Sequence, residues 1–147
     1  MDTRTTVLYV DDNPKSSRLL GSVLEECGFR IICKNDPVEA LALCRRVYFD
    51  LALLDYEMPV MTGAQLAREI KQMVPDVPVV LISGRSAMSP PEMEFVDAHF
   101  GFGTDLDDLL WTMRILVKPR VLVPDHRSHH LPRDQGHVTE SRWADST

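Results

Sequence analysis

Residues 50–63 read DLALLDYEMPVMTG, and this stretch decides the fold. Its apolar run, residues 51–54, is not interrupted by polar side chains, which predicts a short strand buried on both faces. The strand ends at Asp55, and Pro59 and Gly63 are typical of the loop that follows. A strand that is apolar on both faces needs cover on both faces, so the stretch favours a parallel sheet between two layers of helices.

Short apolar runs and helical patterns alternate on both sides of this stretch. Further strands are expected at residues 7–10, 29–33 and 77–82, with a fifth within residues 95–102. Only a short fourth helix fits before the fifth strand, and the fold class predicted from the alternation is α/β. The expected apolar helix faces are Leu19, Leu20, Val23, Leu24 and Cys27; Val38, Leu41, Ala42 and Val47; Ala64, Ala67, Ile70 and Val74; and Leu106, Leu109, Leu110, Met113 and Leu116.

The composition is that of one globular domain. The chain has 147 residues, 44% of them hydrophobic and 26% charged. The periodicity stops after residue 117, so we expect one domain over residues 5–117 and a flexible tail over residues 118–147. The formal net charge of -6 disfavours a nucleic-acid-binding surface and suits a cationic partner or a bound metal ion.

The three cysteines, Cys27, Cys33 and Cys44, match no zinc-site spacing and no Cys-x-x-Cys motif. We expect them to be buried thiols in helix and strand faces. The first residues carry no signal-peptide pattern, and no apolar run approaches the roughly 18 residues that span a bilayer. The expectation is a cytoplasmic protein that does not contact a membrane.

Polar side chains follow three of the expected strands. Asp11 and Asp12 follow the first strand, and Asp55 ends the central one. Ser83 follows the fourth strand. Because ligands of an open parallel sheet bind outside the carboxyl ends of its strands, we expect these groups to converge at that edge. Each of them alone would be an ordinary turn or helix-capping residue, and their occurrence in order favours a shared site.

Converging carboxylates need a cation. Two carboxylates about 4 Å apart repel each other by roughly 4 kcal/mol at an effective dielectric constant near 20. Mg²⁺ prefers oxygen ligands, and its positive charge offsets this repulsion. It also leaves one carboxylate free to attack phosphorus. We expect Asp55 to be this nucleophile and Asp11 and Asp12 to be metal ligands. Ser83 is expected to donate its hydroxyl to a phosphoryl oxygen.

Three blocks of this sequence, VLYVDDNP at 7–14, the stretch 50–63 and PVVLISG at 78–84, closely resemble the response-regulator receiver family over about residues 5–117. The resemblance implies a flavodoxin-like receiver fold, doubly wound, with five parallel strands in the order 2-1-3-4-5. It also implies that Asp55 accepts a phosphoryl group, with Mg²⁺ as cofactor. The donor would be a histidine kinase or a phosphotransfer protein.

The resemblance also assigns roles to single residues. It implies that Mg²⁺ is held by Asp11, Asp12, Asp55 and the backbone carbonyl of Glu57. Ser83 matches the family's switch hydroxyl. Two positions depart from the pattern, because Phe102 stands where the family has a lysine at the end of the fifth strand, and His99 stands near its switch aromatic residue. An apolar ring cannot bridge the aspartate and the phosphoryl oxygens as an ammonium group does.

Four aromatic residues lie around the fourth and fifth elements, which often form a partner surface in this family. They either belong to the core or enlarge an apolar patch on that surface. These residues are Phe95, Phe100, Phe102 and Trp111.

The predicted function is phosphorelay signalling by a monomer or homodimer without an output domain, which acts by binding a protein partner and not nucleic acid or a membrane. The alternative is a pseudo-receiver, a phosphorylation-insensitive interaction module, and Phe102 motivates it. We do not expect an enzyme beyond phosphoryl acceptance and slow autodephosphorylation. A phosphatase that uses Asp55 and Glu57 is disfavoured because the chain has no cap segment. No Gly-x-Gly-x-x-Gly motif for dinucleotides follows the first strand.

Overall fold

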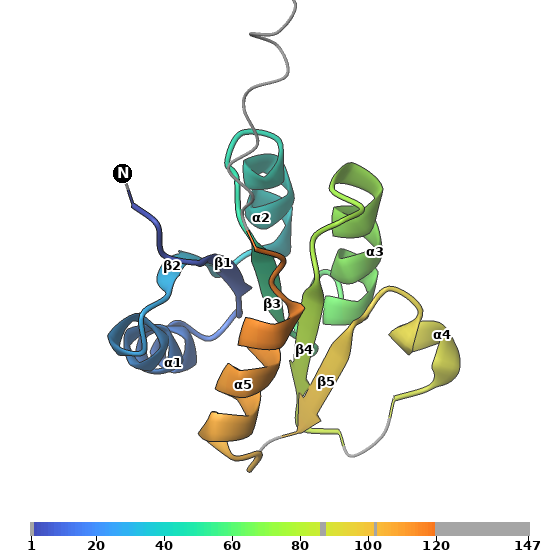
Figure 1. Cartoon of the computed structure of the whole chain (residues 1–147). Helices are drawn as coiled ribbons and strands as arrows, with labels where there is room; N and C mark the ends of the chain where they lie inside the picture. Colours follow the sequence, from blue (N-terminus) through green and yellow to red (C-terminus); the bar gives the residue numbers. More distant parts are fainter. Residues whose placement is uncertain (1, 86–87, 102, 120–147) are drawn as a thin grey trace, which may run out of the picture.

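The computed structural model describes residues 2–85, 88–101 and 103–119. Its centre is a five-stranded parallel sheet with the strand order β2-β1-β3-β4-β5, as Figure 1 shows. The predicted fold class and strand order are confirmed. The strands are β1 (Thr6–Val10), β2 (Arg30–Lys34), β3 (Leu51–Asp55), β4 (Val79–Ser83) and β5 (Ala98–Gly101).

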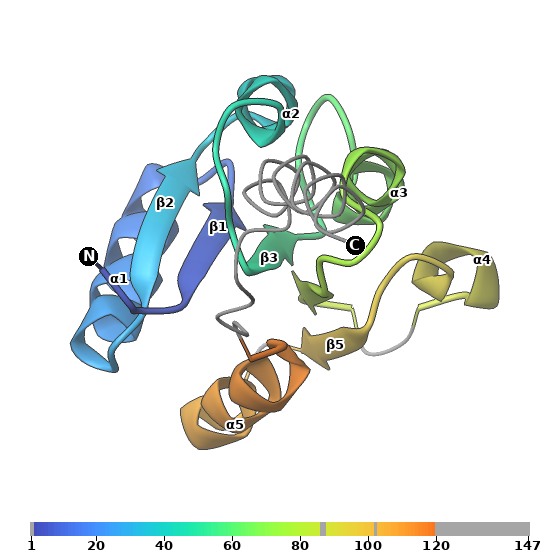
Figure 2. The same cartoon turned by 45° about the horizontal axis from the view of Figure 1, so that its top comes forward.

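The helices cover both faces of the sheet. Figure 2 shows α1 and α5 on one face and α2 and α3 on the other, with α4 beyond the β5 edge. The fourth helix has only four residues, in agreement with the prediction that only a short helix fits before the fifth strand. The helices are α1 (Pro14–Glu26), α2 (Pro37–Cys44), α3 (Gly63–Met73), α4 (Pro90–Met93) and α5 (Leu106–Leu116).

The core consists of two layers, one on each face of the sheet. Residues 51–54 are 0% exposed, as their uninterrupted apolar run predicted. Alternate residues of a strand point to opposite faces, so Leu54 packs in the layer under α2 and α3 while Leu53 packs in the layer under α1 and α5. The central strand is therefore fixed from both sides, and its carboxyl end is held in place.

Helix caps set where α1 and α3 begin at the carboxyl edge of the sheet. The Asn13 side chain accepts hydrogen bonds from the backbone N–H groups of Lys15 and Ser16, which starts α1 after a loop of three residues. Thr62 and Gln65 form a capping box that starts α3. These caps place the start of each helix next to the edge at which Asp11, Asp12 and Asp55 lie.

Several expected apolar positions are wrong. Leu19 is 72% exposed and Val38 is 54% exposed, while α2 buries Ala40 instead of Ala42 and ends before Val47. The apolar pattern of such a short helix fits more than one rotation about its axis, and only the sheet decides which stripe is buried. Two strands are also shifted: β2 covers Arg30–Lys34 instead of 29–33, and β4 covers Val79–Ser83 instead of 77–82.

The cysteines and aromatic residues give a mixed outcome. Cys33 is exposed because it lies on the edge strand β2, which corrects the expectation of buried thiols, whereas Cys27 and Cys44 are partly buried. Phe95 and Phe100 pack against the core, and Trp111 is 65% exposed.

No helix in the described ranges is long and apolar enough to cross a membrane. The expected tail lies outside the described residues from residue 120 onward, and its flexibility stays a prediction.

Candidate metal centre

Three carboxylates meet at the carboxyl edge of the sheet. Asp11 and Asp12 follow β1, and Asp55 is the last residue of β3, the strand that pairs with β1. One oxygen of each carboxylate lies within 4.8 Å of an oxygen of the other two. The predicted convergence of these side chains is confirmed.

Asp11 is the most rigidly held of the three. It is 6% exposed, its Oδ2 accepts a hydrogen bond from the Tyr9 hydroxyl at 2.9 Å, and its Oδ1 accepts one from the Asn13 backbone N–H at 2.9 Å. Its backbone carbonyl accepts a hydrogen bond from Asn35 Nδ2 at 2.7 Å. The carboxylate is thus oriented before any ligand arrives.

Tyr9 was not foreseen as part of the site. Its hydroxyl is buried beside the Asp11 carboxylate, and this burial and negative charge hold the pKa of Tyr9 well above its ordinary value. The hydroxyl therefore stays protonated and donates to Asp11. The sequence could have indicated this role, because Tyr9 and Asp11 are two residues apart and side chains at that spacing share one face of an extended chain.

Asp55 cannot ionise freely in this cluster. Burial raises the pKa of Asp55 to about 7, with further upward contributions from the charges of Asp11 and Asp12. The backbone N–H of Glu57 donates a weak hydrogen bond to Asp55 Oδ1 at 3.3 Å and opposes this rise only in part. An all-oxygen donor set with this excess of negative charge fits a hard divalent cation such as Mg²⁺.

The repulsion has a measurable effect on stability without metal. The native state holds a proton on Asp55 up to about pH 7, whereas the unfolded chain loses it near the ordinary pKa of 3.8. In EDTA, we expect the free energy of unfolding of the wild type to fall between about pH 4 and pH 7, by about 1–2 kcal/mol after allowance for solvent screening. In Asp55→Asn this contribution is absent, so the variant should gain stability relative to the wild type as the pH rises. Urea denaturation at pH 5 and pH 8 measures the difference, and parallel pH profiles of the two proteins would contradict it.

The remaining predicted residues occupy different places. Ser83 ends β4 and is 0% exposed, and its Oγ accepts a hydrogen bond from the Arg85 backbone N–H at 2.9 Å. Ser83 does not line the pocket above the carboxylates, whereas Glu57 does. Phe102 lies outside the described residues. The Nε2 atom of His99 is buried and has no hydrogen-bond partner within the part of the chain that the structure describes.

The carboxylates form the polar end of a pocket of about 680 Å³. Its other walls are largely apolar and come from α1, β4 and the start of α5, including Leu20, Ile82 and Leu106. Apart from the three aspartates, Glu57 is also acidic, and none of the described residues that line the pocket is a lysine or arginine. The pocket is therefore suited to a cation at its polar end.

A second polar network joins the loop after β3 to α4. Arg85 Nη1 donates hydrogen bonds to the Tyr56 hydroxyl at 2.8 Å and to Glu92 Oε1 at 2.9 Å, and the guanidinium lies 5.1 Å from the Tyr56 ring centroid. The Tyr56 hydroxyl itself donates to Glu92 Oε1, and Ser89 donates to Oε2. These hydrogen bonds, first that from Tyr56, lower the pKa of Glu92 to about 2. Sequence reasoning missed this network, because no local pattern relates its members.

Residues 7–99 match the sequence profile of the response regulator receiver domain. The chain belongs to this family. The match contains all three aspartates, Glu57 and Ser83, and it confirms the resemblance that the three sequence blocks indicated.

Curated relatives contain the receiver as part of longer proteins. The chain is 30% identical over 132 residues to protein-glutamate methylesterase/protein-glutamine glutaminase 3 of Hahella chejuensis, a match that covers 79% of this chain and 38% of that protein. It is 35% identical over 81 residues to the autoinducer 1 sensor kinase/phosphatase LuxN of Vibrio campbellii, covering 55% of this chain and 10% of that protein. The chain thus corresponds to a minor part of these relatives.

The matches to solved receivers cover those chains almost completely. The response regulator TrrA of Thermotoga maritima, crystallised with Mg²⁺ and beryllium fluoride, is 29% identical with a TM-score of 0.72, and the match covers 77% of this chain and 99% of TrrA. A similar match, also 29% identical with a TM-score of 0.72, is to a chain in the crystal structure of the histidine kinase ThkA in complex with TrrA; it covers 78% of this receiver and 99% of that chain.

Proposed function

We propose that this receiver accepts a phosphoryl group on Asp55 while Asp11, Asp12, Asp55 and the backbone carbonyl of Glu57 hold Mg²⁺. The observation that carries the proposal is the meeting of three carboxylates, within 4.8 Å of one another, at the end of the central strand. The Mg²⁺ in the TrrA structure supports the choice of metal. The Phe102 substitution, inferred from the sequence, makes this an atypical receiver.

The chemical step needs one nucleophile and one leaving group. A carboxylate oxygen of Asp55 attacks phosphorus, an oxygen–phosphorus bond forms, and the bond between phosphorus and the donor breaks. With a phosphohistidine donor the imidazole leaves with the electron pair of the phosphorus–nitrogen bond; with acetyl phosphate, acetate leaves. Bound Mg²⁺ would supply neutralising charge. Asp11, oriented by Tyr9 and Asn13, would keep its oxygen directed to the metal, and the Ser83 hydroxyl would donate to a phosphoryl oxygen.

The donor that we propose is a histidine kinase or a phosphotransfer protein. The complex of TrrA with the kinase ThkA supports this class of partner. The phosphorylated receiver would then signal by binding a protein partner, and its own catalysis would be limited to slow hydrolysis of the acyl phosphate.

A second candidate is a pseudo-receiver that binds its partner without being switched by phosphate. It is favoured by the absence of lysine and arginine among the described residues that line the acidic pocket, together with Phe102 at the position of the family's lysine. In this case phosphorylation, if it occurs, changes the conformation little.

Incubation with acetyl phosphate and Mg²⁺, followed by intact-mass measurement, tests the proposal. We expect the wild type to gain one phosphoryl group and Asp55→Asn to gain none, because the amide is not nucleophilic. Asp76→Asn, which removes an exposed charge from the loop before β4 at the opposite edge of the sheet, should be labelled like the wild type. Labelling that persists in Asp55→Asn would contradict the assignment. A labelled wild type whose NMR spectrum is unchanged near Ser83 would favour the pseudo-receiver.

A further inference from the structure

Among the described residues that line the acidic pocket, none offers a lysine or arginine to balance the charge that a phosphoryl group would add. Its described lining contributes the carboxylates of Asp11, Asp12, Asp55 and Glu57 and no lysine or arginine. A phosphorylated side chain carries about -1.5 to -2 charges near neutral pH. One divalent metal ion among so many carboxylates leaves an excess of negative charge, and a cationic side chain close to the pocket would be attracted to it.

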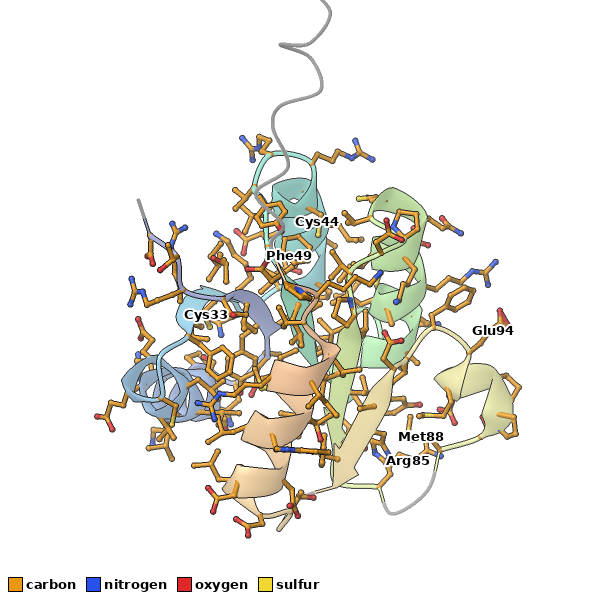
Figure 3. All side chains as sticks on the ribbon, in the orientation of Figure 1. Cys33, Cys44, Phe49, Arg85, Met88 and Glu94 are labelled. Carbon is orange, nitrogen blue, oxygen red and sulfur yellow. The ribbon has the colours of Figure 1, made fainter. Side chains whose placement is uncertain are left out.

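Arg85 is a cation that hydrogen bonds connect to residues beside this site. It lies two residues after the end of β4, and its backbone N–H is hydrogen-bonded to Ser83 Oγ. Its guanidinium is bonded to the hydroxyl of Tyr56, the residue that follows Asp55. Tyr56 is in turn tied to β4, since its backbone N–H donates to the Ile82 carbonyl at 2.8 Å. In the view of Figure 3, Arg85 lies between β5 and α4.

The present partner of Arg85 belongs to α4. Nη1 pairs with Glu92 Oε1 at 2.9 Å, and the two side chains are 46% and 22% exposed, respectively. An ion pair so open to solvent contributes little to stability, because water solvates both charges well when they separate. Arg85 therefore loses little when it exchanges this partner for a more highly charged one.

We propose that Arg85 is the switch cation of this receiver: it pairs with Glu92 when Asp55 is free and moves to the phosphoryl oxygens when Asp55 is phosphorylated. This inference rests on the proposed function. The planar guanidinium fork can donate two parallel hydrogen bonds to a phosphoryl group, which its single shared contact with Glu92 does not use. The exchange leaves Glu92 with its hydrogen bonds from Tyr56 and Ser89, and α4 loses its ion pair with the segment after β4.

The test uses the full 147-residue chain with saturating Mg²⁺ and beryllium fluoride, the combination present in the TrrA structure, as a mimic of the phosphoryl group. Isothermal titration calorimetry measures the affinity for beryllium fluoride. We expect Arg85→Ala to lower this affinity about tenfold, as for loss of a hydrogen bond to a charged group. Glu92→Gln should raise it about threefold, because it removes the competing carboxylate. Arg85→Lys should restore part of the affinity, since it keeps the charge without the fork.

The opposite signs of the two effects distinguish a switch from a purely structural link. If the network only positions α4, Arg85→Ala and Glu92→Gln both break it and change the affinity in the same direction, which would overturn the inference. The Nε–Hε NMR resonance of Arg85, assigned with Arg85→Lys, should also shift when beryllium fluoride binds. A wild type that binds beryllium fluoride while Arg85→Ala binds it equally well refutes only the role of Arg85. A wild type that neither binds it nor accepts phosphate from acetyl phosphate refutes the proposed function, and the inference with it.

Discussion

Replacement of Gly63 with alanine is expected to lower the free energy of unfolding by about 3 kcal/mol, the upper end of the range for overpacked sites. A Cβ atom at this position would lie 2.4 Å from the Asp55 carbonyl oxygen, 2.6 Å from Leu81 Cδ1 and 2.9 Å from Tyr56 Cα. Two of these contacts are with backbone, which cannot rotate away as a side chain can. Gly63 N–H also donates to the Tyr56 carbonyl at 2.8 Å, so a shift that relieves the clash breaks this hydrogen bond. Urea denaturation of the two proteins measures the loss.

Gly21→Ala is the matched control. Gly21 is buried within α1, but a Cβ there would meet only Ile31 Cγ2, at an ordinary contact distance of 3.8 Å. Alanine in a helix is favoured over glycine by roughly 0.5–1 kcal/mol, so this variant should be as stable as the wild type or slightly more stable. An equal loss of stability in both variants would show that burial, and not the approach of α3 to Asp55, makes Gly63 sensitive.

The sequence was sufficient to predict those parts of the site whose positions depend on where strands end. The sequence predicts that Asp11 and Asp55 meet, because each lies at the carboxyl end of a strand and the carboxyl ends of parallel strands share one edge. In the structure Val10 of β1 pairs with Leu54 of β3, and this register brings Asp11 and Asp55 to the same edge. Family resemblance added the strand order, which periodicity alone left open.

What the sequence could not supply depends on contacts between distant segments. The sequence predicts a loop at Gly63, whereas its close approach to the Asp55 carbonyl depends on the packing of α3 on the sheet. The network of Tyr56, Arg85 and Glu92 joins three segments whose separations have no periodic relation. The exposure of Val38 depends on how α2 is rotated, which its eight residues do not determine.

Residues placed by strand ends and residues joined by long-range contacts bear on the function in different ways. The three carboxylates of the candidate metal centre lie at or just after strand ends, so their location is a property of the fold. The Arg85 network is built from loop and helix ends, and it is there that this receiver's response can differ from that of other receivers with the same strands. The neutral hydroxyl of Tyr9 is also positioned by a strand, because β1 holds it beside Asp11.

Substitution of Asp11 by asparagine is expected to weaken Mg²⁺ binding about 100-fold, or roughly 2.7 kcal/mol. A dication and a carboxylate about 4 Å apart attract by about 8 kcal/mol at an effective dielectric constant near 20, and desolvation offsets much of that attraction. The variant should fold, because the amide oxygen can accept from the Asn13 N–H while the amide nitrogen donates to the Tyr9 hydroxyl. Isothermal titration calorimetry with MgCl₂ measures the change.

Asp76→Asn again provides the control, since it removes the same charge from an exposed loop at the far edge of the sheet. Its Mg²⁺ affinity should differ from that of the wild type by less than about twofold, because exposed charges beyond a Debye length are screened. Equal weakening in both variants would mean that Mg²⁺ responds to the overall charge of -6 and not to a defined centre. Strong weakening in Asp11→Asn alone would place the cation among the three carboxylates, where the proposed attack on phosphorus by Asp55 needs it.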